Sequence, residues 1–190
     1  LTGSQAAGDS LLAQIQSFAK ATPFATAELA ELSKQLLAYG FTSDEIIPTI
    51  DKLGNVAAGV GKDKLPNLVL ALGQIRSTGR LTGQDLNQLV NAGFNPLQEI
   101  SRTTGESIVS LKDKMSKGLI TFKDVDGAFK TATSSGGKFF NLLQNQSNSA
   151  KGALDQMGDS IESLKRAIGE NLTSTVSSVT SAFTELVNIV

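Results

Sequence analysis

The sequence predicts an all-α protein, and three observations lead to that prediction. Apolar residues recur at intervals of three or four along most of the chain, which is the period of one helix face. Sustained alternation at a period of two, which would indicate strands, is missing. Glycines and capping residues interrupt the apolar runs where helices would end and begin. With 40% hydrophobic but only 5% aromatic residues among 190, the core is expected to consist mainly of Leu, Ile, Val and Ala.

The apolar stripes can be followed in order along the first part of the chain. Four of them are Leu11, Ile15, Phe18 and Ala19; Leu29, Leu32, Leu36 and Leu37; Ile46, Ile50, Leu53, Ala57 and Val60; and Leu65, Leu68, Val69, Leu72 and Ile75. Pro48 falls within the third stripe, so it either lies in the first turn of that helix or kinks it. The whole pattern predicts roughly eight to ten helices of about 8–18 residues, joined by tight turns.

Capping residues predict where several helices begin and end. Thr42 followed by Glu45 fits a capping box, and Asn95 before Pro96 places a good N-cap ahead of a proline that needs no amide partner. Glycines follow four apolar runs, where a left-handed residue would stop a helix: Gly40, Gly79, Gly93 and Gly118.

Two pairs of short segments resemble each other within the chain. "QLLAYGF" (35–41) resembles "QLVNAGF" (88–94), and each predicts a helix end, a glycine stop and a phenylalanine that packs back. "STGRLTGQDL" (77–86) resembles "SKGLITFKDV" (116–125). These echoes are too short and too unevenly spaced to be a solenoid repeat.

The second pair of segments predicts two helix–turn–helix joints. Both members carry a glycine, an apolar residue, a threonine and an aspartate in the same order: Gly79, Leu81, Thr82 and Asp85, and then Gly118, Ile120, Thr121 and Asp124. We expect the glycine to end one helix, the apolar residue to anchor the crossing, and Thr-x-x-Asp to start the next helix. Residues 72–86 are therefore predicted to be a joint between helices and not a loop that cradles phosphate.

The C-terminal part of the chain has a different pattern. From Phe139 to Val190 a three–four apolar spacing continues for about fifty residues, which predicts a long amphipathic helix that seeks a partner, as in a coiled coil. We therefore predict a compact helical domain over residues 1–138 and a coiled-coil-like segment over residues 139–190. The chain begins with Leu1 and ends in an uncapped apolar run, so we expect it to be a piece of a longer protein.

The composition excludes several kinds of chemistry. The chain has no cysteine and no histidine, which removes disulfides, thiolate nucleophiles, Cys/His zinc sites and imidazole bases. Its 17 Lys and Arg against 18 Asp and Glu give a net charge of −1, which argues against wholesale attraction to nucleic acid. No stretch approaches the length of an uncharged membrane span, and the N-terminus lacks a signal-peptide pattern.

The nearest approach to a phosphate-binding motif is "GNVAAGVGKDK" (54–64). A P-loop would need a glycine where Val56 stands, and Asp63 after the lysine would repel phosphate. We interpret this stretch as a glycine-rich connection. Ser-x-x-Lys, the spacing of some serine hydrolases, occurs at 17–20 and 135–138, but the companion motifs of those enzymes are absent.

Carboxylate pairs and a basic region complete the candidates. The pairs are Asp44 with Glu45 and Asp124 with Asp126, and we expect helix-capping roles for Asp44, Glu45 and Asp124. Residues 62–138 carry 11 Lys and Arg against 7 Asp and Glu, a balance of +4. Four lysines gather near the second predicted joint: Lys112, Lys114, Lys117 and Lys123. The phenylalanines lie where core packing explains them, so a solvated surface is the expected use of these charges and contact with DNA is the alternative.

Five segments of the chain, in order, resemble the N-proximal domain of tail tape measure proteins from long-tailed phages and prophages. They are "ATPF" (21–24), "LLAYGFTSDEIIPTIDKLGNVAAG" (36–59), "ALGQIRSTGRLTGQDLNQLVNAGFNPLQEIS" (71–101), "MSKGLITFKDVDGAFKTATSSGGKFFN" (115–141) and "QSNSAKGALDQMGDSIESLKRAIGENL" (146–172). The block "GQIRSTGRLTGQDLNQLVNAGF" is the most specific part, because its glycines and polar residues coincide where helix propensity alone would not require them.

The resemblance implies a structural protein of virion assembly that acts in tail-length determination, with no catalytic, cofactor-binding or metal-binding residue in this domain. It also implies a place inside the tail tube, after assembly in the host cytoplasm, and contacts with tube and tail-tip or assembly proteins. The apolar spacing over residues 139–190 further predicts a homo-oligomer that forms through the C-terminal helix. Transient DNA contact through residues 62–138 remains the alternative function. No small-molecule substrate is expected.

Overall fold

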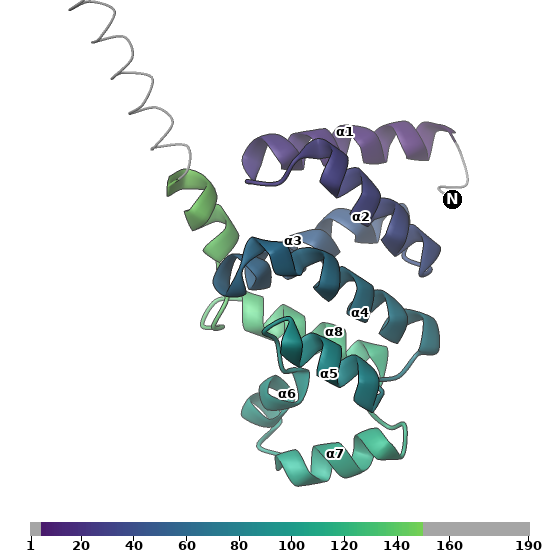
Figure 1. Cartoon of the computed structure of the whole chain (residues 1–190), viewed down its shortest axis with the longest axis vertical. Coiled ribbons are helices and arrows are strands. Elements are labelled where there is room, and N and C mark those ends of the chain that lie inside the picture. Colours follow the sequence, from purple (N-terminus) through teal and green to yellow (C-terminus); the bar gives the residue numbers. More distant parts are fainter. Residues whose placement is uncertain (1–4, 150–190) are drawn as a thin grey trace, which may run out of the picture. The chain divides into compact units, whose positions relative to one another are not determined.

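The computed structural model describes residues 5–149, in which helices joined by short turns and links make up the fold (Figure 1). The helices are α1 (Gln5–Ala21), α2 (Thr26–Ala38), α3 (Ser43–Val60), α4 (Leu65–Thr78), α5 (Gly83–Asn91), α6 (Pro96–Thr104), α7 (Ile108–Ser116) and α8 (Phe122–Thr133), with a 3-10 turn η1 (Lys62–Lys64) after α3. Residues 142–149 are helical again. The all-α prediction is confirmed. Most of the long C-terminal helix predicted over residues 139–190 lies outside the described residues.

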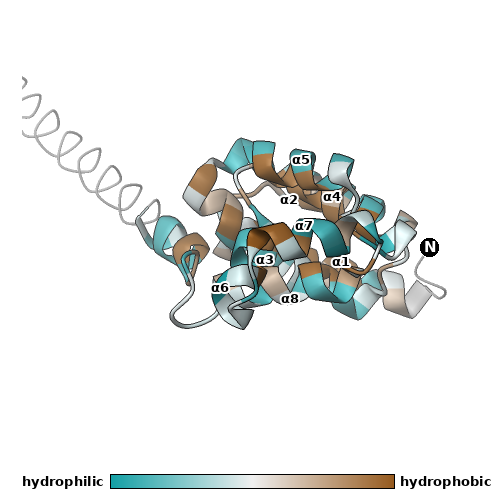
Figure 2. Ribbon diagram, turned by 90° about the horizontal axis from the view of Figure 1, so that it is seen from below, coloured by the Kyte–Doolittle hydropathy of each residue, from teal (hydrophilic) through white to brown (hydrophobic). Residues whose placement is uncertain are grey.

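Helices α3 and α4 form the centre of the compact unit. Helix α3 packs on α1, α2, α4 and α8, while α4 packs on α2, α3, α5 and α8. Helix α7 packs on α6 at the far end of the unit from α1 and α2 (Figure 1). Figure 2 shows hydrophobic residues gathered on α2, α3 and α4 and hydrophilic residues along outer faces.

The predicted apolar stripes are confirmed as core residues. Those that are buried are Leu11, Ile15, Leu29, Leu32, Leu36, Ile46, Ile50, Leu53, Ala57, Leu65, Leu68, Val69, Leu72 and Ile75. The remaining members pack against this core from half-buried positions: Phe18, Ala19, Leu37 and Val60. The three–four spacing places these side chains on one face of each helix, so their burial follows directly from the sequence pattern.

The predicted helix ends are also confirmed. The four stop glycines have φ angles between 72° and 91°: Gly40, Gly79, Gly93 and Gly118. After Gly40 and Gly93, the amides of Phe41 and Phe94 donate back to the carbonyls of Leu36 (3.2 Å) and Leu89 (2.9 Å), and both rings are buried. This backbone pattern is the Schellman motif, in which the residue after the glycine packs onto the helix that it has just left.

The predicted N-caps occur as well. The Asn95 side chain accepts from the amides of Leu97 and Gln98, at 3.1 and 3.2 Å. The Glu45 carboxylate accepts from the Thr42 amide at 2.8 Å, and α3 begins at the next residue, Ser43. Pro48 therefore lies beyond the first turn of α3, which removes the first of the two predicted alternatives and leaves a kink as the other. The helix continues past the proline to Val60.

The interpretation of residues 54–64 as a glycine-rich connection was wrong for most of its length. Gly54 and Gly59 lie inside α3, and only Gly61, with φ +122°, stands at a turn. A Cβ on Gly54 would lie 3.0 Å from Leu143 Cδ2, and one on Gly59 would lie 2.7 Å from the Phe139 ring. Both glycines are explained by close packing of other segments, which the local sequence does not reveal.

The compact unit extends to Ser147. Phe139 and Leu143, which begin the predicted C-terminal segment, are 4% and 2% exposed and belong to the core of the compact unit. The division into a compact domain and a coiled-coil-like segment concerns mainly residues beyond those described, and it stays a prediction.

Candidate functional site

The two predicted joints lie side by side and hydrogen-bond to each other. The first joint (residues 79–82) connects α4 to α5, and the second joint (residues 117–121) connects α7 to α8. The Leu81 amide donates to the Ile120 carbonyl at 2.8 Å, and the Phe122 amide donates to the Gly79 carbonyl at 3.0 Å. These bonds form an antiparallel bridge between Arg80 and Thr121. The echo in the sequence thus corresponds to a pair of joints in space, although the sequence pattern did not predict that the two joints meet.

Each joint uses its threonine and aspartate in a capping box, as predicted. The Asp85 carboxylate accepts from the Thr82 amide at 3.0 Å, and the Asp124 carboxylate accepts from the Thr121 amide at 2.8 Å. Paired helix–loop–helix units bind calcium when a twelve-residue loop supplies several oxygen ligands. These joints are far shorter, and no group of three acidic residues in the described part of the chain is placed to hold a metal ion.

A cluster of charged and aromatic side chains connects the second joint to the start of α3. The Arg76 guanidinium lies 4.8 Å from the ring centroids of both Phe41 and Phe122, which meet edge to face. Arg76 also donates to the Glu45 carboxylate at 3.1 Å. Burial raises the pKa of Glu45, but the hydrogen bond from the Thr42 amide and the charge of Arg76 outweigh burial and lower the pKa overall.

The candidate carboxylate pairs have separate partners in the structure. Asp44 and Glu45 lie in the first turn of α3 and Asp124 in the first turn of α8, as expected for capping roles. Asp126 instead forms an ion pair with Lys52 of α3. Asp126 and Glu45 do border the same small cavity, of about 180 Å³, but each already has a cationic partner there. The arrangement is that of interhelical ion pairs and gives neither carboxylate the role of a free acid or base.

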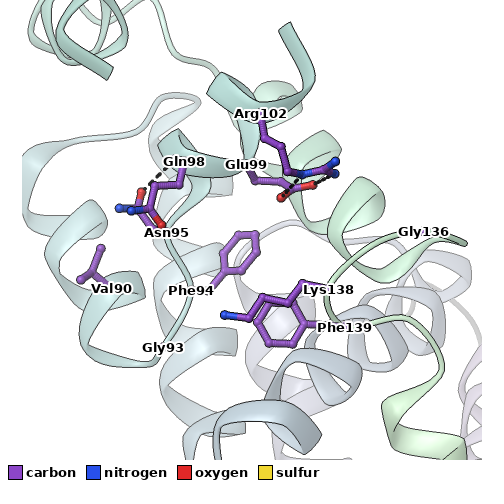
Figure 3. A pocket seen from close by; sticks show the side chains of 10 residues that line it. All are labelled: Val90, Gly93, Phe94, Asn95, Gln98, Glu99, Arg102, Gly136, Lys138 and Phe139. Carbon is purple, nitrogen blue, oxygen red and sulfur yellow. Dashed lines mark hydrogen bonds and ion pairs between the residues drawn. The ribbon is translucent and has the colours of Figure 1, made fainter. Parts of the chain in front are cut away.

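A surface groove of about 590 Å³ lies between α6 and the link that follows α8 (Figure 3). The rings of Phe94 and Phe139 lie together in it, and the Lys138 ammonium is 5.2 Å from the centroid of the Phe139 ring. Arg102 and Glu99 form an ion pair on the α6 side. Lys138, the lysine of one Ser-x-x-Lys stretch, thus lies in a link; Ser17 and Lys20 of the other lie on α1.

The basic region is partly neutralised by pairing within α7 and just before it. Lys114 donates to Glu106 at 2.7 Å, and Lys117 donates to Asp113 at 2.6 Å. The hydrogen bonds from Lys114 and Ser110 lower the pKa of Glu106. Lys112 and Lys123 are exposed. Among the described phenylalanines, Phe140 is 49% exposed, but it lies in the segment after α8 and outside the lysine cluster.

The described residues thus form a helical body in which the two joints hydrogen-bond to each other and ion pairs connect α3 to α4 and α8. A family model described as "Tape measure protein" matches residues 1–181, and the chain belongs to that family. Its members are structural, non-enzymatic phage proteins, so the chain is a component of a phage tail. No curated protein and no solved structure matches the chain. Among the described helices, none is long and apolar enough to cross a membrane.

Proposed function

We propose that the compact unit is a docking or end-marking domain of the tape measure protein and contributes nothing to the measured length. The observation that carries this proposal is the way in which α1–α8 fold back onto the common core around α3 and α4. A straight helix rises about 1.5 Å per residue, so the same residues would span roughly 200 Å as a rod. A body of stacked helices has a length that scales poorly with its number of residues.

The proposal assigns the measuring rod to the chain that follows this body. The family places the chain in a phage tail, and the three–four apolar spacing beyond residue 150 is the pattern that a long helix with partner copies requires. In this account the rod lies inside the tail tube and associates with further copies of itself. The body contacts tube, tail-tip or assembly proteins while the tail forms in the host cytoplasm.

An in-frame deletion in the body tests this assignment. Removal of residues 105–118, which carry α7, should abolish or misdirect tail assembly, because the second joint would lose its first two residues and the helix that leads into it. A deletion of the same size within residues 150–190 should instead give tails shorter by about 20 Å. Proportionate shortening by the deletion in the body would contradict the proposal; electron microscopy of the particles measures both outcomes.

The alternative function, DNA contact through residues 62–138, makes a different prediction. Counterion release would make the affinity for duplex DNA fall steeply with salt, and Lys112→Gln with Lys123→Gln would reduce that slope. We expect no salt-dependent binding by the 190-residue chain in an anisotropy titration, because Lys114 and Lys117 are already paired with Glu106 and Asp113. A steep salt slope that the double substitution reduces would favour the alternative.

A further inference from the structure

The segment after α8, residues 139–147, is seated on α3 by two glycines. The missing side chains of Gly54 and Gly59 leave the space that Leu143, Phe139 and Leu142 fill, at 2.7–3.0 Å from where a Cβ would stand. Separations below 3.0 Å are closer than a real Cβ tolerates, so Gly59 is the tighter of the two seats. The sequence "GNVAAGVG" is thus a receptor for a segment about 80 residues further along the chain.

A polar bond locks the segment between these two seats. Asn55 is 7% exposed, and its Oδ1 accepts from the Leu143 amide at 3.1 Å while its Nδ2 donates to the Asp51 carbonyl at 2.9 Å. The Leu143 amide belongs to the first turn of the helical residues 142–149, where amides have no partner within the helix. Asn55 therefore acts as an N-cap supplied by another helix, 88 residues away in sequence.

The residue that would normally cap this helix does not do so. Asn141 precedes the first helical residue and has a side chain well suited to capping, but its φ is +56°. An N-cap residue has extended backbone angles, whereas the left-handed region is open to asparagine at moderate cost. The local sequence thus leaves the start of this helix dependent on α3.

The segment is also fixed by α8 and by the link between α5 and α6. The Phe139 amide donates to the Ala132 carbonyl at 2.8 Å, and its ring lies 6.2 Å from the ring of Phe94. Gly137 makes the close turn possible, because a Cβ there would lie 2.4 Å from the Ala132 carbonyl oxygen.

We propose that residues 139–147 are a latch that fastens the outgoing chain to α3 and opens as one unit. Its parts are the Gly54 and Gly59 seats and the Asn55 cap. Opening would need the Asn55 bond and both seats to be given up together, because the helical turns of the segment depend on a cap that α3 provides. The role of the latch in a tail rests on the proposed function: a pull on the rod would reach α3 directly and would not have to pass through the link after α8.

Hydrogen exchange on the purified 190-residue chain tests the latch independently of any phage function. In Asn55→Leu, the amides of residues 142–147 should exchange about 5- to 100-fold faster, the factor expected when a buried amide loses its acceptor, while those of α4 stay within about twofold. Gly59→Leu should speed the exchange of the same amides, because its side chain would occupy the space that Phe139 and Leu142 fill. Gly127→Ala is the matched control, because a Cβ on that α8 residue meets nothing within 4 Å.

The outcomes separate the latch from a general loss of stability. Faster exchange confined to residues 139–147 supports it. The proposal is overturned if these amides exchange at unprotected rates in the unsubstituted chain, or if α4 is released to the same extent in Asn55→Leu. If Gly59→Leu does not fold, Asn55→Leu alone decides between the latch and a general loss of stability. A failure of the proposed docking role would leave all of these rates unchanged.

Discussion

The two joints carry the same local sequence pattern in different surroundings. In the first joint Leu81 is 1% exposed and Asp85 5% exposed, and half of the residues of α4 ahead of it are buried. In the second joint Ile120 is 4% exposed but Asp124 is exposed, and α7 ahead of it contributes one buried residue, Leu111. The comparison shows that the short sequence pattern determines the path of the backbone, whereas the packing around each joint determines how much its residues stabilise the fold.

The largest difference is expected at the apolar anchors. Leu81→Ala should lower the free energy of unfolding by about 3–5 kcal/mol and Ile120→Ala by about 2–3 kcal/mol, because a site beside the thinly packed α7 can collapse around the lost atoms more easily. Urea unfolding followed by circular dichroism measures both values. Equal values, or the reverse order, would show that the two joints are packed alike.

The capping aspartates should differ by less. Asp85→Ala leaves the amide of half-buried Thr82 without its acceptor and should cost about 2 kcal/mol. Asp124→Ala exposes the Thr121 amide to water and should cost about 0.5–1 kcal/mol. The same unfolding experiment applies, with Gly83→Ala as a control, because a Cβ there meets nothing within 4 Å. An equal loss in the free energy of unfolding at the two aspartates would mean that burial does not affect how much a capping box stabilises the fold.

The stop glycines should show no difference between the joints. Gly79 and Gly118 have nearly equal φ angles, +76° and +72°. Alanine at either position is strained by about 1 kcal/mol, and the flexible Arg80 side chain near Gly118 is free to move aside. A gap of more than about 1 kcal/mol between the two variants would reveal a tertiary contribution at one of the glycines.

The smallest effect is expected from acid, at the contact that connects the second joint to α3. The pKa of Glu45 is lower in the folded chain than its ordinary value, so its stabilising contribution is present above that ordinary value and is lost as the pH falls through the lowered one. Glu45→Gln should flatten the dependence of the free energy of unfolding on pH in this acidic window. Near neutral pH the shape of that dependence should be the same as in the unsubstituted chain. Thermal unfolding at a series of acidic pH values measures this dependence. An unchanged dependence in Glu45→Gln would show that Glu45 does not cause the loss of stability in acid.

Local features were predictable from the sequence and long-range ones were not. The capping boxes and glycine stops depend on residues within one turn of each other, so the pattern around Thr82 or Gly118 is sufficient to predict them. The seat at Gly59 and the Asn55 cap depend on contacts with Phe139 and Leu143, more than 75 residues further on. Inside an apolar stripe such a glycine has the same appearance as a loop glycine, which is why residues 54–64 were misjudged.

The pairing of the two joints was partly predictable from the sequence. The repeated order of glycine, apolar residue, threonine and aspartate was visible in the sequence, and it could have suggested that the two segments meet. Antiparallel bonding between Leu81 and Ile120 requires more, namely that α4 and α8 pack together, and only the assembled core determines that.

The central claim, that the compact unit does not measure length, is tested most directly by tail lengths after matched insertions. About 20 helix-forming residues would be inserted after Gly105, in the exposed turn between α6 and α7, or within residues 150–190 of the same protein. We expect tails longer by about 30 Å for the insertion within residues 150–190 and tails of unchanged length for the insertion after Gly105. Equal lengthening by both insertions, seen by electron microscopy, would contradict it.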